Sequence, residues 1–314
     1  MKLKVINNFP DPFHPKFSFK EWDKQFVSHN AVLNGYYSNI YYPEHWTTLS
    51  IKCAFNGVEY YIKDNIKYGV DDNSYLILNN GTMYESYIRS ENKVESFTVN
   101  FTKEFTEEVF NSLNNKDSFL LDYPEVKDRE PVNFFEKLYQ HNPLILKLLN
   151  DIRKTIQTPG YDNVLLNEKL HMMLNVLFCI QLNTFKDADS VNAVKKSTRM
   201  ELYRRLNIAK DYIYSNYYDN VTLDELSKVS CLSQHHLLRK FKTQFGITPH
   251  QYLTKRRMEA AKVLIEKTNF SISEICFSVG FEDLSSFGEL FKKHYSFSPE
   301  NYRKSYSSKK AILT

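Results

Sequence analysis

The chain has 314 residues, of which 42% are hydrophobic and 25% are charged. This length predicts two domains, and the apolar content is sufficient for two cores. No run approaches 18 apolar residues and none follows the N-terminal lysines. We therefore expect no membrane span and no signal peptide, and we expect a cytoplasmic protein.

The net charge of +4 is unevenly distributed along the chain. Residues 199–314 hold 19 Lys and Arg against 12 Asp and Glu, which leaves 22 against 25 for residues 1–198. The C-terminal part therefore carries +7 and the N-terminal part −3. A basic module beside a mildly acidic one predicts nucleic-acid binding at one end of the chain, although charge alone never identifies it.

Residues 1–131 show the pattern of an antiparallel β domain. Short runs rich in β-branched and aromatic residues are separated by turn residues such as Asn56-Gly57 and Asn79-Asn-Gly81. The close spacing predicts hairpins in a barrel or a double sheet. The expected strands are 49–55, 58–62, 66–70, 74–78 and 94–101.

The N-terminal domain lacks the residue patterns of common enzymes. Its histidines before residue 141 are His14, His29 and His45, and none is paired at metal-ligand spacing. Phosphate-binding glycine loops and the nucleophile motif G-x-S-x-G are absent. Cys53, Cys179, Cys231 and Cys276 lack C-x-x-C spacing and are expected to stay reduced. We therefore expect no catalytic residue, no metal and no cofactor.

A barrel mouth is a common small-molecule site. Aromatic side chains of this domain could stack on a ligand, although most aromatics in a β domain are ordinary core or surface residues. We name His45 and Trp46 as the candidate ligand-binding residues. The other candidate aromatics are Tyr60, Tyr61, Tyr84 and Tyr87.

Residues 132–197 change to helical spacing. Apolar residues recur at intervals of three and four in residues 134–138, 144–152 and 165–182. The third segment is apolar on several sides, which predicts packing on another helix or on a second chain. Residues 187–198 are the expected exposed linker, and Thr198-Arg199 opens the first helix of the next domain.

Residues 198–314 contain two sequence copies of one helical unit. Thr222 and Ser271 each have a glutamate three residues later, the signature of a capping box at a helix start. A tight turn and a new N-cap follow in each copy. Equivalent positions are 49 or 50 residues apart, which predicts two copies of a helix-turn-helix layout. The new N-caps are Ser233 and Asp283, and the buried pairs that follow are Leu237 with Phe241 and Phe287 with Phe291.

The opposite face of each second helix is the candidate DNA-reading surface. For an isolated helix a solvated polar face would be the better interpretation, but the duplication, caps and turns favour DNA contact. Arginine is the commonest reader of guanine, and lysine mostly contacts phosphate. The predicted DNA-contacting residues are His235, Leu238, Arg239 and Lys242 in the first copy and Ser285, Ser286, Glu289 and Lys292 in the second.

These motifs closely resemble the C-terminal domain of the AraC/XylS family of transcription regulators. The resemblance covers about residues 200–305 and includes Gly280-Phe281 in the second turn and the closing Ser298-Pro-Glu-Asn-Tyr302-Arg303. It implies two recognition helices in successive major-groove faces, joined by a long helix over about residues 249–267. The sequence departs from the family pattern at Glu289, at Gly288 inside a helix and at Ser296, where glycine is usual.

The same resemblance, more weakly, implies a cupin-like effector domain at residues 1–131 and dimerisation through the helical region. The expected fold class is therefore α+β. We expect a cytoplasmic regulator that binds promoter or operator DNA as a homodimer, responds to a small molecule such as a carbohydrate, and contacts RNA polymerase if it activates. Two alternatives stay open: a ligand-independent regulator whose barrel only dimerises, or a cupin-type enzyme fused to a DNA anchor.

Overall fold

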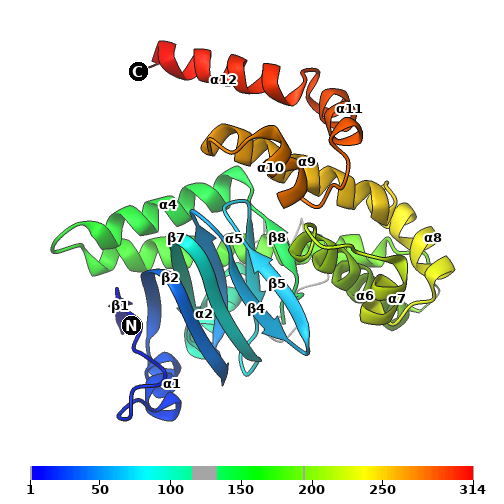
Figure 1. Ribbon diagram of the computed structural model, residues 1–314. Coiled ribbons are helices and arrows are strands. Elements are labelled where there is room, and N and C mark those ends of the chain that lie inside the picture. The colour runs from blue at the N-terminus through cyan, green and yellow to red at the C-terminus, as the bar shows by residue number, and fades with distance from the viewer. Residues whose placement is uncertain (1, 115–132, 194, 314) are drawn as a thin grey trace. The chain divides into compact units, whose positions relative to one another are not determined.

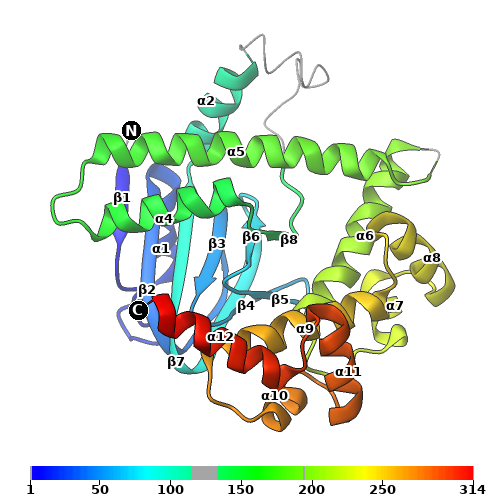
Figure 2. The ribbon, with the colours of Figure 1, turned by 90° about the horizontal axis from the view of Figure 1, so that it is seen from above.

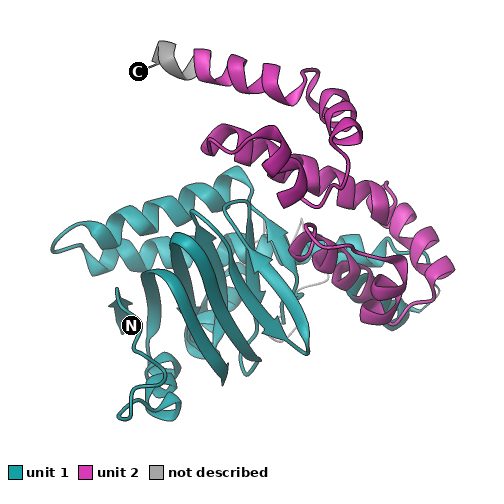
Figure 3. Ribbon diagram, viewed as in Figure 1, with its two compact units in different colours: residues 1–204 teal, residues 205–314 magenta. Residues whose placement is uncertain are grey.

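A computed structural model describes residues 2–114, 133–193 and 195–313. The chain forms two compact units, residues 1–204 and 205–314 (Figure 3). Strands lie in the first unit, and the second unit is helical (Figure 1). The structure thus has the mixed α and β content predicted from the sequence.

The first unit is built on one eight-stranded sheet. The strand order is β1-β2-β7-β3-β6-β8, and β4 pairs with both β5 and β7. Only β1 runs parallel to its neighbour, β2. The strands are β1 Leu3–Ile6, β2 Asn30–Trp46, β3 Leu49–Phe55, β4 Glu59–Lys63, β5 Ile66–Val70, β6 Ser74–Leu78, β7 Met83–Phe101 and β8 Leu138–Gln140.

Strand β7 divides the sheet into two branches. Its residues 85–87 pair with β4, whereas its residues 95–101 pair with β3. Its partner β2 follows both parts, with register shifts between Tyr37 and Asn39 and between Tyr42 and His45. Such irregularities bend strands. Among the described strands, β1, β5 and β8 each have one partner, so the closed barrel considered from the sequence does not form.

Two helices cover one face of this sheet. Helices α4 (Pro143–Gln157) and α5 (Asn163–Asp189) run side by side above the strands (Figure 2). Their buried faces join the strands and α2 (Lys103–Asn114) in one hydrophobic core. Helix α5 is apolar on several sides, and packing against the sheet, α2 and α4 within the unit accounts for most of this surface. Val164, Leu165 and Met172 of α5 remain exposed.

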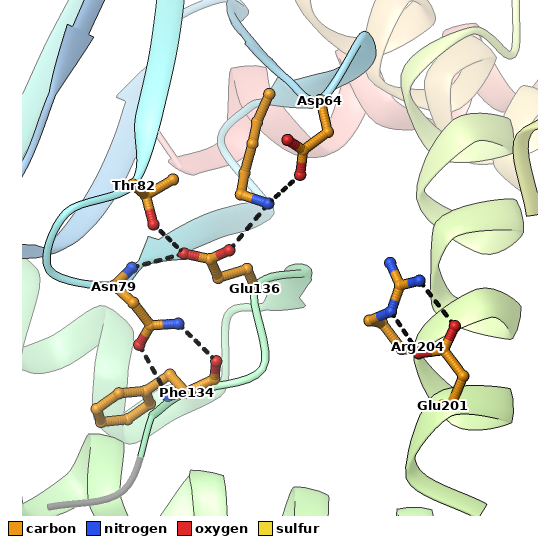
Figure 4. A network of polar contacts seen from close by, with 8 residues as sticks. Asp64, Asn79, Thr82, Phe134, Glu136, Glu201 and Arg204 are labelled. Carbon is orange, nitrogen blue, oxygen red and sulfur yellow. Dashed lines mark hydrogen bonds and ion pairs between the residues drawn. The ribbon is translucent and has the colours of Figure 1, made fainter. Parts of the chain in front are cut away.

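The segment before β8 was predicted as helix and is instead held in extended form. Glu136 accepts hydrogen bonds from the Asn79 backbone N (2.8 Å) and from Thr82 Oγ1 (2.5 Å), and it pairs with Lys63 Nζ (3.1 Å) (Figure 4). The Asn79 side chain exchanges two 2.8 Å hydrogen bonds with the Phe134 backbone. These bonds to the β6–β7 turn override the local helical spacing, so the prediction of a helix at 134–138 was wrong.

The sequence analysis did not predict the two remaining helices of the first unit, α1 (Phe19–Ser28) and α2. Helix α1 begins after Ser18, and α2 follows β7 directly. Strands β3, β5 and β6 have the predicted bounds, whereas β7 begins 11 residues before the predicted residue 94. The strand β2 was not predicted, because its apolar and polar residues do not alternate cleanly.

The second unit is a chain of seven helices within the described residues, the first of which, α6, crosses the boundary between the units. Long α9 coincides with the predicted connector at 249–267. The helices are α6 Lys196–Ser215, α7 Leu223–Ser230, α8 Gln234–Phe245, α9 Pro249–Lys267, α10 Ile272–Ser278, α11 Leu284–Tyr295 and α12 Pro299–Leu313.

Two glycines of this unit allow a matched stability test. Gly280 (φ +88°) and Gly246 (φ +76°) both have left-handed backbone, which costs alanine about 1–2 kcal/mol. A Cβ at Gly280 would also approach Tyr218 O at 2.8 Å and Arg257 Nη2 at 2.9 Å, whereas nothing lies within 4 Å at Gly246. We expect Gly280→Ala to destabilise the protein more than Gly246→Ala in urea unfolding. Equal losses would contradict the tight contact at Gly280.

Candidate nucleic-acid interface and ligand cavity

Both predicted capping boxes are present in the C-terminal unit. Glu225 N donates to Thr222 Oγ1 (3.2 Å), and Thr222 N donates to Glu225 Oε2 (2.9 Å). Ser271 and Glu274 exchange the same pair of bonds at 3.1 and 2.6 Å. These bonds satisfy backbone donors that would otherwise be unpaired at the starts of α7 and α10. The duplication seen in the sequence is therefore a duplication of local structure.

The second helix of each copy is held by its own cap and by two buried side chains. Ser233 accepts from His236 N at the start of α8, and Asp283 accepts from Ser285 N and Ser286 N at the start of α11. These hydrogen bonds lower the pKa of Asp283. The buried pairs predicted from the sequence, Leu237 with Phe241 and Phe287 with Phe291, are all 0% exposed.

Helix α9 and Arg257 connect the two copies. Thr248 and Gln251 form a third capping box, and Pro249 occupies the first turn of α9. Arg257 donates from Nε to Tyr217 O (2.8 Å) and from Nη2 to Asp219 O (2.9 Å), which ties α9 to the segment that leads into α7. The second recognition-type helix ends at Ser296, whose φ of +66° is the strained conformation that glycine usually adopts.

All eight predicted DNA-contacting side chains are exposed. On α8 they form a stripe of one histidine, one leucine, one arginine and one lysine. On α11 they form a stripe of two serines, one glutamate and one lysine. The first stripe holds His235, Leu238, Arg239 and Lys242, and the second holds Ser285, Ser286, Glu289 and Lys292. The buried pairs occupy the opposite faces of these helices, so the stripes face away from the core of the C-terminal unit.

The first unit contains a cavity of about 50 Å³ between the sheet and α1. The two sequence candidates His45 and Trp46 both line it, as do Tyr61 and Tyr84. Tyr60 and Tyr87 do not line it and instead stack on each other at 5.1 Å. The residues that sequence reasoning missed are Phe9, Phe19, Trp22, Asp23, Phe26, Leu33, Tyr42, Lys52, Glu59 and the polar group Thr47, Ser86, Ser96, Thr98 and Asn100.

A directed chain of hydrogen bonds crosses the cavity wall. His45 Nδ1 lies 2.8 Å from Pro43 O, which can only accept, so Nδ1 carries the proton. Burial lowers the pKa of His45 to about 4, so the ring is neutral and its Nε2 accepts from Tyr84 Oη (2.9 Å). Tyr84 Oη in turn accepts from Lys52 Nζ (2.8 Å). The imidazole tautomer and the phenol orientation are thereby fixed.

Two carboxyl groups lie in the same cavity. Burial raises the pKa of Asp23 to about 6 and also raises the pKa of Glu59. Among the described residues, no hydrogen bond reaches Glu59 Oε2. Burying such a group without a partner is costly. The cavity therefore offers acceptors that a ligand with hydroxyl or amine donors would satisfy.

Lys52 and Glu59 carried a signal that the sequence analysis did not use. Lys52 stands in the middle of the fully buried strand Leu49–Phe55, and a charge there is expensive unless it has a function or a partner. Asp23 offered no comparable signal, because α1 itself was not predicted. In the described part of the chain, no three metal-ligating side chains are grouped to hold a metal, and no helix is long and apolar enough to cross a membrane.

Comparisons with known proteins agree with the C-terminal geometry. A family described as "Helix-turn-helix domain" matches residues 226–305. The raffinose operon transcriptional regulatory protein RafR of Pediococcus pentosaceus is 32% identical over 157 residues, which are 50% of this chain and 54% of RafR. The probable transcriptional regulator LumQ of Photobacterium leiognathi is 27% identical over 197 residues, 63% of this chain and 75% of LumQ. The chain thus aligns with about half of RafR.

One similar solved structure is the C-terminal domain of the response regulator yesN from Fusobacterium nucleatum. It is 40% identical in sequence, the aligned region spans 31% of this chain and 94% of the yesN domain, and the TM-score is 0.30. The C-terminal unit is a helix-turn-helix domain of the AraC type. The curated relatives of this domain are named as transcriptional regulators, RhaS of Escherichia coli among them.

The buried histidine predicts a pH dependence of stability. His45 stays neutral in the folded protein down to about pH 4, whereas in the unfolded chain it binds a proton below about pH 6.5. The unfolded state therefore gains protons first, and the folded state loses stability as the pH falls through this window. We expect the free energy of unfolding of the native protein to fall relative to that of His45→Gln between pH 7 and 4. A constant difference between the two proteins would contradict the buried neutral imidazole.

Proposed function

We propose that this protein is a sequence-specific DNA-binding transcription regulator whose two helix pairs both read DNA. The duplicated capped helix pair with an exposed stripe carries this proposal. In such pairs the second helix enters the major groove, and here α8 and α11 are those helices. Residues 198–314 form the DNA-binding domain in this assignment.

The length of α9 supports two contacts on one face of the duplex. Its 19 residues span about 28 Å at 1.5 Å per residue. One turn of DNA is about 34 Å, so a connector of this length suits two adjacent major-groove segments. The first helix pair supplies Arg239 and Lys242 and dominates the affinity. The second supplies Glu289, which can accept from cytosine N4 but repels phosphate.

The N-terminal cavity supports control by a small molecule. Aromatic side chains of α1 and β2 line it together with hydroxyl, amide and carboxyl groups. This mixture suits a carbohydrate, because its C–H groups pack on aromatic rings and its hydroxyls both donate and accept. Relatives named as regulators of the raffinose and lactose operons are consistent with such a ligand. We place the effector domain at residues 1–131.

The helical region 132–197 is proposed to form a homodimer contact. The exposed side chains of Val164, Leu165 and Met172 on α5 give it an apolar surface. A dimer would bind two DNA sites, and an activator would also contact RNA polymerase. The ligand-independent alternative leaves the unpartnered Glu59 Oε2 without a purpose, and the regulator relatives disfavour a fused enzyme.

Replacing Arg239 by alanine tests base reading. If its guanidinium contacts a guanine edge, the loss is about 1–3 kcal/mol, roughly 5- to 150-fold in affinity, on the specific site. Binding to random DNA should change little. The measurement is fluorescence anisotropy of promoter and random duplexes at fixed salt, with the full chain. Lys228→Ala is the matched control, because Lys228 is an exposed base on α7 outside the stripe.

If Arg239→Ala weakens binding to both duplexes equally, Arg239 contacts phosphate and does not read a base. Glu289→Ala gives a comparison on the second stripe. Weaker binding to the specific site alone indicates that Glu289 accepts from cytosine, whereas tighter binding to every duplex indicates phosphate repulsion.

The cavity should report its own ligand, because both tryptophans of the chain, Trp22 and Trp46, line it. We expect a short monosaccharide from a panel containing glyceraldehyde and erythrose to change the intrinsic tryptophan fluorescence. The response should survive a chelator. Trp46→Ala should weaken binding in calorimetry, whereas Tyr60→Ala, outside the cavity, should not. Loss of binding on metal removal would instead favour the enzyme alternative.

A further inference from the structure

Lys52 is a buried amine that faces the cavity. It is 3% exposed, lies in the centre of β3, and lines the cavity together with Asp23 and Glu59. Among the described residues its ammonium group donates one hydrogen bond, to Tyr84 Oη at 2.8 Å. No carboxylate lies within ion-pair distance of it in the described chain. The amine is therefore held at one point and otherwise open to the cavity.

The surroundings of Lys52 are unusual for a lysine with a purely structural role. A structural buried lysine is normally paired with a carboxylate. Here the nearby carboxylate oxygen Glu59 Oε2 accepts no hydrogen bond from the described chain. An amine with unused hydrogen-bond donors and a carboxyl oxygen with unused acceptor capacity thus line one cavity.

We propose that Lys52 binds a small hydroxyaldehyde or hydroxyketone as a reversible imine. This inference rests on the proposed effector role of the cavity and specifies how its ligand is held. The unpartnered Glu59 Oε2 and the Asp23 carboxyl would accept hydrogen bonds from the hydroxyl groups of the ligand. Phe19 and Trp22 would pack against its carbon chain.

The chemistry balances without an added co-reactant. The amine lone pair of Lys52 attacks the carbonyl carbon, the C–N bond forms, and the C=O π electrons move to oxygen, which takes up a proton. The carbinolamine hydroxyl then leaves as water with a second proton, while the nitrogen lone pair forms the C=N bond and the nitrogen loses its protons. One water is released and no oxidation occurs; hydrolysis reverses the sequence.

The charged groups around Lys52 favour this reaction at neutral pH. Burial lowers the pKa of Lys52 to about 7, partly offset by Glu59 on β4 and Asp23 on α1, so much of the amine is uncharged. A surface lysine titrates near pH 10.4. Asp23, whose pKa burial raises to about 6, can hold the proton that the leaving water needs. The remaining polar neighbours, His45 on β2 and Tyr84 on β7, stay neutral at this pH.

The size and charge of the cavity limit which ligands it can accept. A volume of about 50 Å³ holds about four waters at 10–15 Å³ each, which suits a chain of two to four carbons. Two carboxyl groups against one lysine disfavour an acidic ligand. A short, uncharged hydroxycarbonyl compound meets both conditions.

Reductive trapping on the full chain tests the proposal. The native protein is incubated with glycolaldehyde and cyanoborohydride at pH 7, and labelled peptides are followed by mass spectrometry. Lys52 should be labelled at least 10-fold faster than Lys24, a surface lysine that is 60% exposed. The labelling rate at Lys52 should reach half its maximum near pH 7, because burial lowers the pKa of its amine to about 7.

Three controls separate the possible outcomes. Asp23→Asn should slow labelling at Lys52 and leave Lys24 unchanged, and Lys52→Met should remove that one adduct. Because Lys52→Met could fail to fold, the pH profile of the native protein serves as the decisive measurement. Labelling at Lys52 no faster than at Lys24 overturns the imine. If monosaccharides still change tryptophan fluorescence in that case, the effector function survives and only the covalent step is lost.

Discussion

A helix of seven or eight residues is not stable by itself in water, and this constraint shapes the whole C-terminal unit. Helices α7 and α10 have these lengths and survive because capping boxes satisfy their free backbone donors. Further stability comes from packing: α7 packs onto α8, and α10 packs onto α9 and α11. Local bonds at Thr222 and Ser271 therefore stabilise the first helix of each pair, onto which the stripe-bearing helix packs.

The same logic explains why the polar stripes can vary in charge while the scaffold repeats. Phe241 and Phe291 are fully buried at equivalent places, so each recognition-type helix is oriented by its core face. The outward face carries little of the folding energy. Glu289 therefore occupies the position in the second copy that Arg239 occupies in the first, and the two copies present different side chains on the same scaffold.

The N-terminal unit follows the opposite principle, because it stores polar groups inside. Lys52, Glu59 and Asp23 are each less than 5% exposed, and within the described residues no hydrogen bond reaches Glu59 Oε2. Incomplete satisfaction of buried polar groups costs stability. A ligand that donates hydrogen bonds to these groups removes this cost. Its binding therefore stabilises the folded protein by mass action and favours the conformation that binds it.

Local signals made the C-terminal unit predictable. The N-caps at Thr222, Ser233, Ser271 and Asp283, and the connector 249–267, could be read from the sequence because caps and proline act within a few residues. The forked sheet could not, because the pairing of β7 with both β3 and β4 is a long-range choice. His45 and Trp46 were found as aromatic candidates, whereas Lys52 and Asp23 became visible only when the sheet and α1 enclosed one cavity.

The central claim is that two copies of one helix pair contact DNA on the same face. Hydroxyl-radical footprinting of the full chain on a promoter fragment measures this directly. The account predicts two protected segments whose centres are about one helical turn, roughly 10 base pairs, apart within each bound site. A single protected segment that is lost on Arg239→Ala but unaffected by changes on α11 would contradict it.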